Sequence, residues 1–495
     1  MTRTVAVAAP HADATAAGEA AARAGGNALD AALAAAAVLA VTYPHQCGVG
    51  GDLTALVRRP DGSVVALLSL GAAAAAVDVG RLRAGGPAMP RQGPQAVTVP
   101  GATAGWAALA DLGAELGLAA PVERAARLAE EGTPVVAGLA RAIASRPDAV
   151  TLDPGLRGVL APGGVPLREG DRFRQPALAA TLRTIAERPL ALYDGPLAER
   201  FADGLRALDS PLTIADLRAH RAELTAPLTL ERAGVRWWAA PPPSQGAVAL
   251  AMLDLDQPGD LLERARRAHD ARQRLLGDPR SGPIDIERLR RPVPVEELTA
   301  APPRHAGDTV AVTAIDDDGW SVALIQSNFQ TFGAGMLEPG TGIVLHNRGS
   351  SFLLEAGHPG AIRAGSRPPH TLCPLLAEGP GLRLALGCQG GRAQPLILAQ
   401  VADGAVDPVA DPVATLAAPR WVVGDRDIGF AVETVLAEPG AAVPSSVAGS
   451  GLTVAAGNPR EDLCGHVQLA RIVDGAGVEA AADPRADGTA AVVRG

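Results

Sequence analysis

The stretch "HAGDTVAVTAIDDDGWSVALIQS", residues 305–327, decides the fold. Its alternation predicts a first strand that presents Val310, Val312 and Ala314 on one face. Residues 316–319, rich in Asp and Gly, supply a turn, and a second apolar run follows. The sequence therefore predicts a β-hairpin here.

The hairpin opens on an acid–threonine step, Asp308–Thr309. Thr is common in strands, so a structural role would explain it. A threonine at the start of a chain, however, carries a nucleophilic hydroxyl. Its α-amine, with a pKa of about 7.7–8.0, can serve as the base for that hydroxyl. This chemistry requires cleavage before Thr309, and the residues alone leave both interpretations open.

The composition excludes several classes of protein. A net charge of −9 without a basic run argues against nucleic acid as the main partner. No uninterrupted apolar run approaches 18 residues, and the first residues lack an apolar leader, so we expect no membrane span and a cytoplasmic location. The histidine spacing indicates no metal site, and we expect no cofactor. Four widely spaced cysteines predict reduced thiols: Cys47, Cys373, Cys388 and Cys464.

The chain changes character along its length. Residues 13–24 and 28–40 predict two helices, and residues 101–221 are mainly helical in pattern. Residues 256–308 are charged and interrupted by proline, which predicts an exposed connecting stretch suited to a cut. Strand patterns predominate beyond Thr309. This division favours an α+β layered fold over a parallel α/β sheet.

The segment "LGCQGGRAQ", residues 386–394, places two glycines between a predicted strand and a predicted helix. The backbone N–H groups of Gly390 and Gly391 would be unshielded by side chains and could point together at an oxyanion. An ordinary loop is the alternative. The earlier glycine cluster "CGVGGD", residues 47–52, lacks the spacing of a nucleotide-binding loop and predicts a tight turn.

Together, nine motifs resemble those of the γ-glutamyltranspeptidase family, and their order and spacing span nearly the whole chain. They are "GGNALDAALAAAAVLAVTYPHQCGVGGD" (25–52), "VTVPGATAGW" (97–106), "FRQPALAATLRTIAE" (173–187), "PPPSQGAVAL" (241–250), "DTVAVTAIDDDGWSVALIQS" (308–327), "FGAGMLEPGTGIVLHNRGSSF" (332–352), "SRPPHTLCP" (366–374), "GCQGGRAQP" (387–395) and "DPRADG" (483–488).

The resemblance implies an N-terminal-nucleophile hydrolase with a four-layer αββα sandwich. The precursor would cleave itself between Asp308 and Thr309 into a large subunit, residues 1–308, and a small subunit, residues 309–495, which share one core. By the same resemblance, Thr309 is the nucleophile, and Gly390 and Gly391 form the oxyanion hole. Ser327 matches a family Thr that supports the nucleophile's amine and the self-cleavage step.

The residues expected to bind substrate depart from the family pattern. A free amino-acid head needs a cation for its carboxylate and an anion for its amine, and losing a charged partner costs about 2–5 kcal/mol. We therefore expect glutathione to be a poor substrate. Arg348 is a candidate replacement cation. The family's Arg, acidic pair and serine pair fall at Gly71 or Ala72, at Ser350 and Ser351, and at His370 and Thr371.

The leading hypothesis is an amide-cleaving or acyl-transferring enzyme that acts on a small-molecule amide or peptide through an acyl-Thr309 ester. Two alternatives stay open. The first is a genuine γ-glutamyl transpeptidase or glutathione hydrolase, with Arg348 or His370 supplying the missing charge. The second is a non-catalytic relative that keeps the fold and stays uncut.

Overall fold

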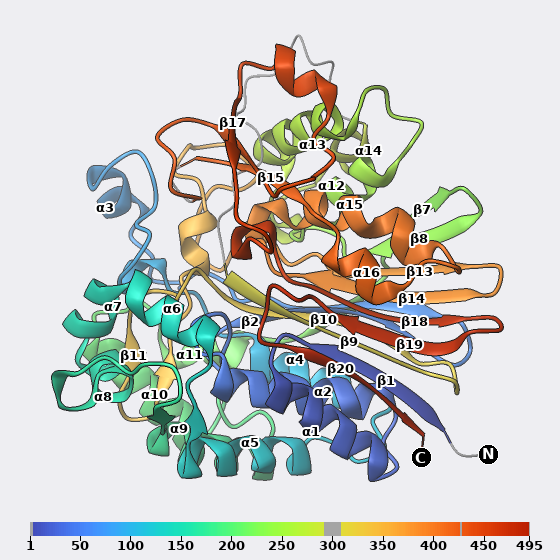
Figure 1. Cartoon of the computed structure of the whole chain (residues 1–495). Coiled ribbons are helices and arrows are strands. Elements are labelled where there is room, and N and C mark those ends of the chain that lie inside the picture. Colours follow the sequence, from blue (N-terminus) through green and yellow to red (C-terminus); the bar gives the residue numbers. More distant parts are fainter. Residues whose placement is uncertain (1–2, 292–307, 426–427, 495) are drawn as a thin grey trace.

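The computed structural model describes residues 3–291, 308–425 and 428–494. Within them, a seven-stranded and a six-stranded antiparallel sheet stack face to face, with helices on both outer faces (Figure 1). The expected four-layer αββα sandwich is confirmed. The first sheet has the order β20 (Thr489–Arg494), β1 (Thr4–Ala9), β9 (Asp308–Asp316), β10 (Ser321–Phe329), β2 (Asp52–Arg58), β3 (Val64–Ser69), β6 (Glu223–Thr225). The second has the order β19 (Gly477–Ala482), β18 (Val467–Val473), β14 (Leu382–Cys388), β13 (Leu375–Gly379), β8 (Val235–Ala239), β7 (Leu228–Arg232).

The predicted hairpin is confirmed as β9 and β10, and it lies inside the seven-stranded sheet between β1 and β2. Val310 and Val312 of β9 pack into the apolar cluster beneath the helices. Ala311 points the other way, into the cluster between the two sheets with Trp238 and Leu376. Alternate side chains of β9 therefore pack on opposite faces of the sheet, one set under the helices and the other between the two sheets.

Helices of the first half cover the outer face of the seven-stranded sheet (Figure 1). Every residue of α2 (Ala28–Thr42) is buried, and a capping box between Asn27 and Asp30 fixes its start. The two helices predicted over 13–24 and 28–40 are confirmed as α1 and α2. The layer also contains α1 (Ala12–Arg23), α4 (Ala102–Asp111), α5 (Ala119–Glu131), α9 (Pro176–Glu187) and α10 (Pro196–Ala207).

A second group of helices covers the six-stranded sheet (Figure 1). Leu386 of β14 packs with Leu398 and Leu250 from two of these helices. They are α12 (Gly246–Leu253), α15 (Gln394–Val406) and α16 (Pro412–Ala417). Further elements are α3 (Val79–Ala84), α6 (Ala137–Ser145), α7 (Pro147–Leu152), α8 (Pro154–Leu160), α11 (Ile214–Ala219), β4 (Thr133–Pro134), β5 (Arg172–Phe173), β11 (Leu337–Glu338), β12 (Ile343–Val344), β15 (Trp421–Gly424), β16 (Thr434–Ala437) and β17 (Thr453–Ala456).

The expectation of an exposed connecting stretch over 256–308 is wrong for its first part. That part contains α13 (Leu261–Leu275) and α14 (Ile286–Arg290), and Ala268 of α13 is fully buried. The many arginines make this segment polar on average, although Leu262, Ala265 and Ala268 form a buried apolar stripe at helical spacing. Residues 292–307 lie outside the described part of the chain.

The strand β1 was not predicted, because the first fifty residues indicated only helices. Alanine dominates its second half, and Ala has a weak strand preference. Pairing on both sides, with β9 and β20, stabilises the strand instead. Tertiary contacts here override local propensity.

In the described ranges, no helix is long and apolar enough to cross a bilayer. No group of three or more His, Cys, Asp or Glu side chains among these residues could hold a metal ion. All four cysteines are buried free thiols.

Candidate active site

Thr309 is the second residue of β9, and it is 1% exposed. Its Oγ1 donates a hydrogen bond to Ser327 Oγ at 2.9 Å. Ser327 Oγ in turn donates to the carbonyl oxygen of Asp308 at 2.6 Å. A single hydroxyl therefore joins the side chain of Thr309 to the carbonyl of the peptide bond that precedes it.

A β-bulge in β10 places Ser327. The register between β10 and β9 shifts between Gln326 and Phe329, and Phe329 adopts a φ of 75°. Such a bulge bends the strand and redirects its side chains. The Phe329 N–H donates to Ser327 Oγ at 2.8 Å. The Ser327 hydroxyl thus accepts two hydrogen bonds and donates one, which is its full capacity.

The loop after β14 carries the two glycines noted in the sequence. Gly390 has a φ of 139°, and Gly391, with a φ of 53°, begins a 3-10 helix, η6 (Gly391–Ala393). Side chains rarely tolerate a φ of 139°, and a Cβ at position 390 would also lie 2.4 Å from Ile397 Cδ1, so the loop favours glycine there. Among the described residues, the N–H groups of Gly390 and Gly391 donate to no other group. Both donors are available to an oxyanion.

Two glutamines tie this loop to its neighbours. Gln389 Nε2 donates to Asp308 Oδ1 at 3.4 Å. Gln245, which is fully buried, donates from Nε2 to the carbonyl oxygens of Gly391 at 2.9 Å and of Thr371 at 2.7 Å. The glycine loop is therefore held both at the Asp308 side chain and at the segment that contains Thr371.

Arg348 begins a second 3-10 helix, η5 (Arg348–Ser351), and it is fully buried. Its guanidinium carbon lies 4.0 Å from the centroid of the Phe329 ring, and its Nη1 donates to Thr371 Oγ1 at 3.0 Å. Burial lowers the pKa of Arg348 to about 9, although the charge of Asp52 opposes this shift. The side chain is therefore a buried cation at neutral pH.

Ser350 and Ser351 lie on the same 3-10 helix. Neither hydroxyl oxygen has a hydrogen-bond partner within the described part of the chain. Both residues line a cavity of about 310 Å³, together with Arg272 and Arg392. This cavity therefore has cationic and neutral polar groups at the two positions where the resemblance led us to expect an acidic pair.

His370 contacts a buried carboxylate. Its Nε2 lies 2.9 Å from Asp52 Oδ2, His346 Nδ1 lies 3.5 Å from the same oxygen, and the Gly71 N–H donates to Asp52 Oδ1 at 2.9 Å. Burial, reinforced by the charge of Arg348, lowers the pKa of His370 to about 3, so this ring is neutral. Burial disfavours the Asp52 carboxylate, but His346, the His370 hydrogen bond and Arg348 outweigh it and lower the Asp52 pKa to about 2. Asp52 is therefore a buried anion.

The segment 67–76, where the resemblance led us to expect the carboxylate-binding Arg, contains no cation. A Cβ at Gly71 would lie 1.5 Å from the carbonyl oxygen of Val99, so no side chain fits there without moving the backbone. Ala72, the other candidate position, is uncharged. Neither position therefore supplies a cation for a carboxylate in this chain.

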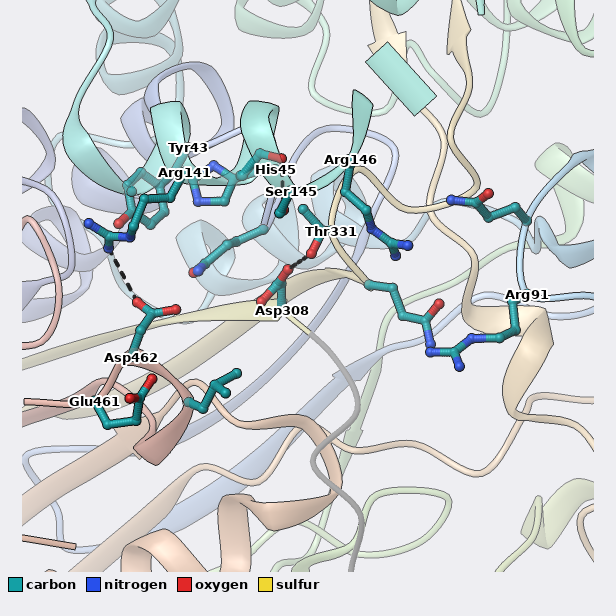
Figure 2. A pocket seen from close by; sticks show the side chains of 16 residues that line it. Tyr43, His45, Arg91, Arg141, Ser145, Arg146, Asp308, Thr331, Glu461 and Asp462 are labelled. Carbon is teal, nitrogen blue, oxygen red and sulfur yellow. Dashed lines mark hydrogen bonds and ion pairs between the residues drawn. The ribbon is translucent and has the colours of Figure 1, made fainter. Parts of the chain in front are cut away.

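A cavity of about 790 Å³ opens beside Asp308, with residues of both charge signs on its walls (Figure 2). The Thr331 hydroxyl donates a hydrogen bond to the Asp308 carboxyl group. Arg141 and Asp462 form an ion pair, with 3.3 Å between Nη2 and Oδ1. Burial, and to a lesser degree the charge of Asp462, raises the pKa of Asp308, although the hydrogen bond from Thr331 opposes this.

The structure thus joins Thr309, Ser327, Arg348, Thr371 and Gly391 in one connected network, whereas the hydroxyls of Ser350 and Ser351 take no part in it within the described ranges. Contacts run from Thr309 through Ser327 and Phe329 to Arg348, and return through Thr371 and Gln245 to the glycine loop. The sequence reasoning missed four members of the network. Three of them fall inside the motifs given above, which is the signal that could have found them: Asp52, Gln245 and Gln389. The fourth, Phe329, lies two residues after Ser327 and outside every motif.

Comparisons with known proteins agree with this architecture. A family model described as gamma-glutamyltranspeptidase matches residues 14–493. The oxamate amidohydrolase proenzyme of Klebsiella pneumoniae is 36% identical over 505 residues, covering 95% of this chain and 94% of the relative. A glutathione hydrolase-like proenzyme of Bacillus subtilis is 32% identical, with coverages of 98% and 97%. A cephalosporin acylase structure from Bacillus halodurans has a TM-score of 0.87 at 30% identity, covering 100% of this chain and 96% of that one.

The four-layer fold is that of the N-terminal-nucleophile hydrolases, a class of enzymes that cleave amides or transfer acyl groups. Within this class, the chain belongs to the γ-glutamyltranspeptidase family.

Proposed function

We propose that this chain is a self-processing N-terminal-threonine amidohydrolase or acyltransferase, cut between Asp308 and Thr309. The observation that carries the proposal is the position of the Ser327 hydroxyl, which contacts both the Thr309 hydroxyl and the Asp308 carbonyl. A group placed in this way can take the proton of the attacking oxygen and polarise the carbonyl under attack.

Self-cleavage then proceeds by transfer of the acyl group from nitrogen to oxygen. Thr309 Oγ attacks the Asp308 carbonyl carbon and gives up its proton, the C–N bond breaks, and the leaving nitrogen takes up that proton to become the new α-amine. Water hydrolyses the resulting ester and leaves Asp308 with a terminal carboxylate. The tetrahedral oxyanion requires donors. The N–H groups of Gly390 and Gly391, which have no partner within the described ranges, lie on the loop that Gln389 joins to Asp308 through a hydrogen bond.

Turnover uses the same groups. The α-amine of Thr309 accepts the proton as Oγ attacks the substrate amide carbonyl, and it donates this proton to the leaving nitrogen as the C–N bond breaks and the amine product departs. An acyl ester on Thr309 remains, and water or an amine resolves it. Each well-placed oxyanion donor contributes about 3–4 kcal/mol to the transition state.

Mass spectrometry of the purified protein, followed by N-terminal sequencing, tests this proposal. We expect two chains, one of which begins Thr-Val-Ala-Val. A single chain of 50.0 kDa after prolonged incubation would instead favour a non-catalytic relative.

The second candidate is γ-glutamyl transfer. The buried cation Arg348 favours it, because it could replace the family's carboxylate-binding Arg. Serines at positions 350 and 351, however, supply hydroxyls in place of the acidic pair that binds the donor amine. A chromogenic γ-glutamyl anilide separates the candidates, since turnover at a rate typical of the family would require a rebuilt amino-acid site.

Removing the Ser327 hydroxyl should slow self-cleavage strongly. A Ser327→Ala variant leaves the Thr309 hydroxyl without its acceptor and the Asp308 carbonyl without its donor. We expect the half-time for disappearance of the full-length band to lengthen about 10²–10³-fold. Ser327→Thr keeps the hydroxyl and should stay within about tenfold of the wild type. Equal rates for the two variants would remove Ser327 from this role.

The raised pKa of Asp308 predicts a pH-dependent stability of the uncut chain. Because the folded-state pKa lies above the unfolded value, the precursor loses stability as the pH rises through the folded pKa. In a Thr309→Ala background, Asp308→Asn should therefore raise the Tm at pH 7–8, and the difference should shrink toward pH 4. Thermal unfolding across this range checks it. The exposed change Asp203→Asn is the control, and a difference independent of pH would contradict the prediction.

A further inference from the structure

The side chain of Asp308 makes hydrogen bonds that the self-cleavage chemistry described above does not use. Thr331 Oγ1 donates to Asp308 Oδ2 (Figure 2), and Gln389 Nε2 donates to Asp308 Oδ1 at 3.4 Å. Within the described ranges, the Asp308 carboxyl group forms no ion pair. Two neutral donors, one on each oxygen, therefore hold the side chain that precedes the scissile bond.

The two donors come from the two sheets of the sandwich. Thr331 lies two residues after Phe329, the last residue of β10 in the first sheet, and Gln389 directly follows β14 in the second. The Gln389 N–H donates to the carbonyl oxygen of His466 at 3.0 Å, which holds its backbone in place. Asp308 itself begins β9, opposite Phe329. Its side chain therefore bridges the two sheets at the scissile bond.

The backbone on both sides of Thr331 is also held. The Gln330 N–H donates to Asn347 Oδ1 at 3.1 Å. The Phe332 N–H donates to the carbonyl oxygen of His45 at 2.9 Å. A side chain supported in this way keeps its own position and can fix the position of a group that it contacts.

The scissile carbonyl needs more than its hydrogen bond from Ser327. That bond holds the carbonyl oxygen at 2.6 Å, but one hydrogen bond does not fix the direction from which Thr309 Oγ meets the carbonyl carbon. Attack requires reacting atoms about 3–3.5 Å apart and aligned, and a displacement of about 1 Å can cost about 10²-fold in rate. A side chain held at both carboxyl oxygens restrains the Cα of Asp308, and with it this direction.

We propose that Asp308 is a positioning residue for its own cleavage: Thr331 and Gln389 hold its side chain, and this sets the scissile carbonyl in line with Thr309 Oγ. The inference rests on the proposed self-processing and specifies which side chains the cleavage site accepts. Position 308 requires a hydrogen-bonding group of the length of Asp, and it does not require a negative charge. The raised pKa of Asp308, which burial causes, agrees with a contact of this kind.

Substitutions at position 308 separate positioning from acid–base chemistry. Asp308→Asn keeps the length, and its amide group can bond to both Thr331 and Gln389. In chains made by cell-free synthesis and followed by loss of the full-length band, we expect Asp308→Asn to be cut within about tenfold of the wild-type rate. Asp308→Ala, which loses both contacts, should be cut about 10²-fold more slowly. Asp308→Glu keeps the carboxyl group but displaces it by one methylene, and it should be as slow as Asp308→Ala.

Two results at this position would overturn the inference. Cleavage of Asp308→Ala at the wild-type rate would show that the side chain is not needed. Cleavage of Asp308→Glu faster than Asp308→Asn would show that the carboxyl group transfers a proton and does not position the bond. Asp203→Ala, at an exposed position of α10, is the control and should be cut like the wild type.

A double-mutant cycle attributes the effect to the contact with Thr331. Thr331→Val should slow cleavage about tenfold or more, and Thr331→Ser should restore most of the rate. In the Asp308→Ala background, Thr331→Val should have no further effect, because the contact is already absent. Multiplying losses would instead give Thr331 a purely structural role and contradict the inference.

Thermal unfolding in the Thr309→Ala background, where no chain is cut, shows which variants fold. If Asp308→Ala does not fold, the comparison of Asp308→Asn with Asp308→Glu decides the question. A wild-type chain that stays uncut would contradict the proposed function itself. A wild-type chain that is cut, together with an equally fast Asp308→Ala, would overturn this inference alone.

Discussion

A Thr309→Ala variant is expected to remain a single chain of 50.0 kDa and to hydrolyse no amide. The variant removes the oxygen that attacks the Asp308 carbonyl, so the precursor retains its peptide bond and exposes no α-amine. Without nucleophile and base, we expect activity to fall by at least about 10⁴-fold, the scale seen when a covalent nucleophile is deleted. Intact mass and an amide-hydrolysis assay measure both effects.

The control for this experiment is Thr309→Ser, which keeps a hydroxyl at the same place in β9. It should still be cut, more slowly, because serine lacks the methyl group that restricts the rotamer of threonine. Two fragments from Thr309→Ala, ending and beginning at the same bond, would refute the assignment of Thr309.

Replacing Gly390 by alanine should produce the second largest effect. The added Cβ would meet Ile397 Cδ1 at 2.4 Å, and alanine rarely adopts the φ of 139° found there. We expect the strained φ to shift the loop, and with it the N–H groups of Gly390 and Gly391 that would bind the oxyanion. We expect kcat to fall about 10²–10³-fold with little change in KM, as for loss of an oxyanion donor.

Gly449→Ala is the matched control, since a Cβ at position 449 would contact nothing within 4 Å. Steady-state kinetics on fully processed protein separate the catalytic effect from slower self-cleavage. A Gly390→Ala enzyme with normal kcat would show that this loop does not stabilise the transition state.

The sequence predicted the parts of the fold whose period is visible locally. The hairpin from Asp308 and the helix α2 follow directly from alternation and from an alanine-rich run. The strand β1 did not, because its stability comes from partners more than 300 residues away in the chain. The helix α13 was hidden by its arginines, whose long side chains dominate the local polarity.

The candidate site also contains residues that local motifs predicted and contacts that they could not predict. Thr309, Ser327 and the glycine pair were identified through motifs, each of which is local. The contacts that join them are not local: Gln245 reaches the Gly391 carbonyl across 146 positions, and His370 meets Asp52 across 318. No spacing rule within one sequence shows which buried polar groups will satisfy one another, so Asp52 and Gln245 needed the structure.

The strand order has a final consequence. If the chain is cut before Thr309, β1 and β2 belong to one polypeptide and the intervening β9 and β10 to the other, while β20 of the second borders β1 of the first. Pulling the two apart would strip hydrogen bonds from several strand edges at once. Dissociation and unfolding should therefore be the same event, and neither half is expected to persist as a folded species on its own.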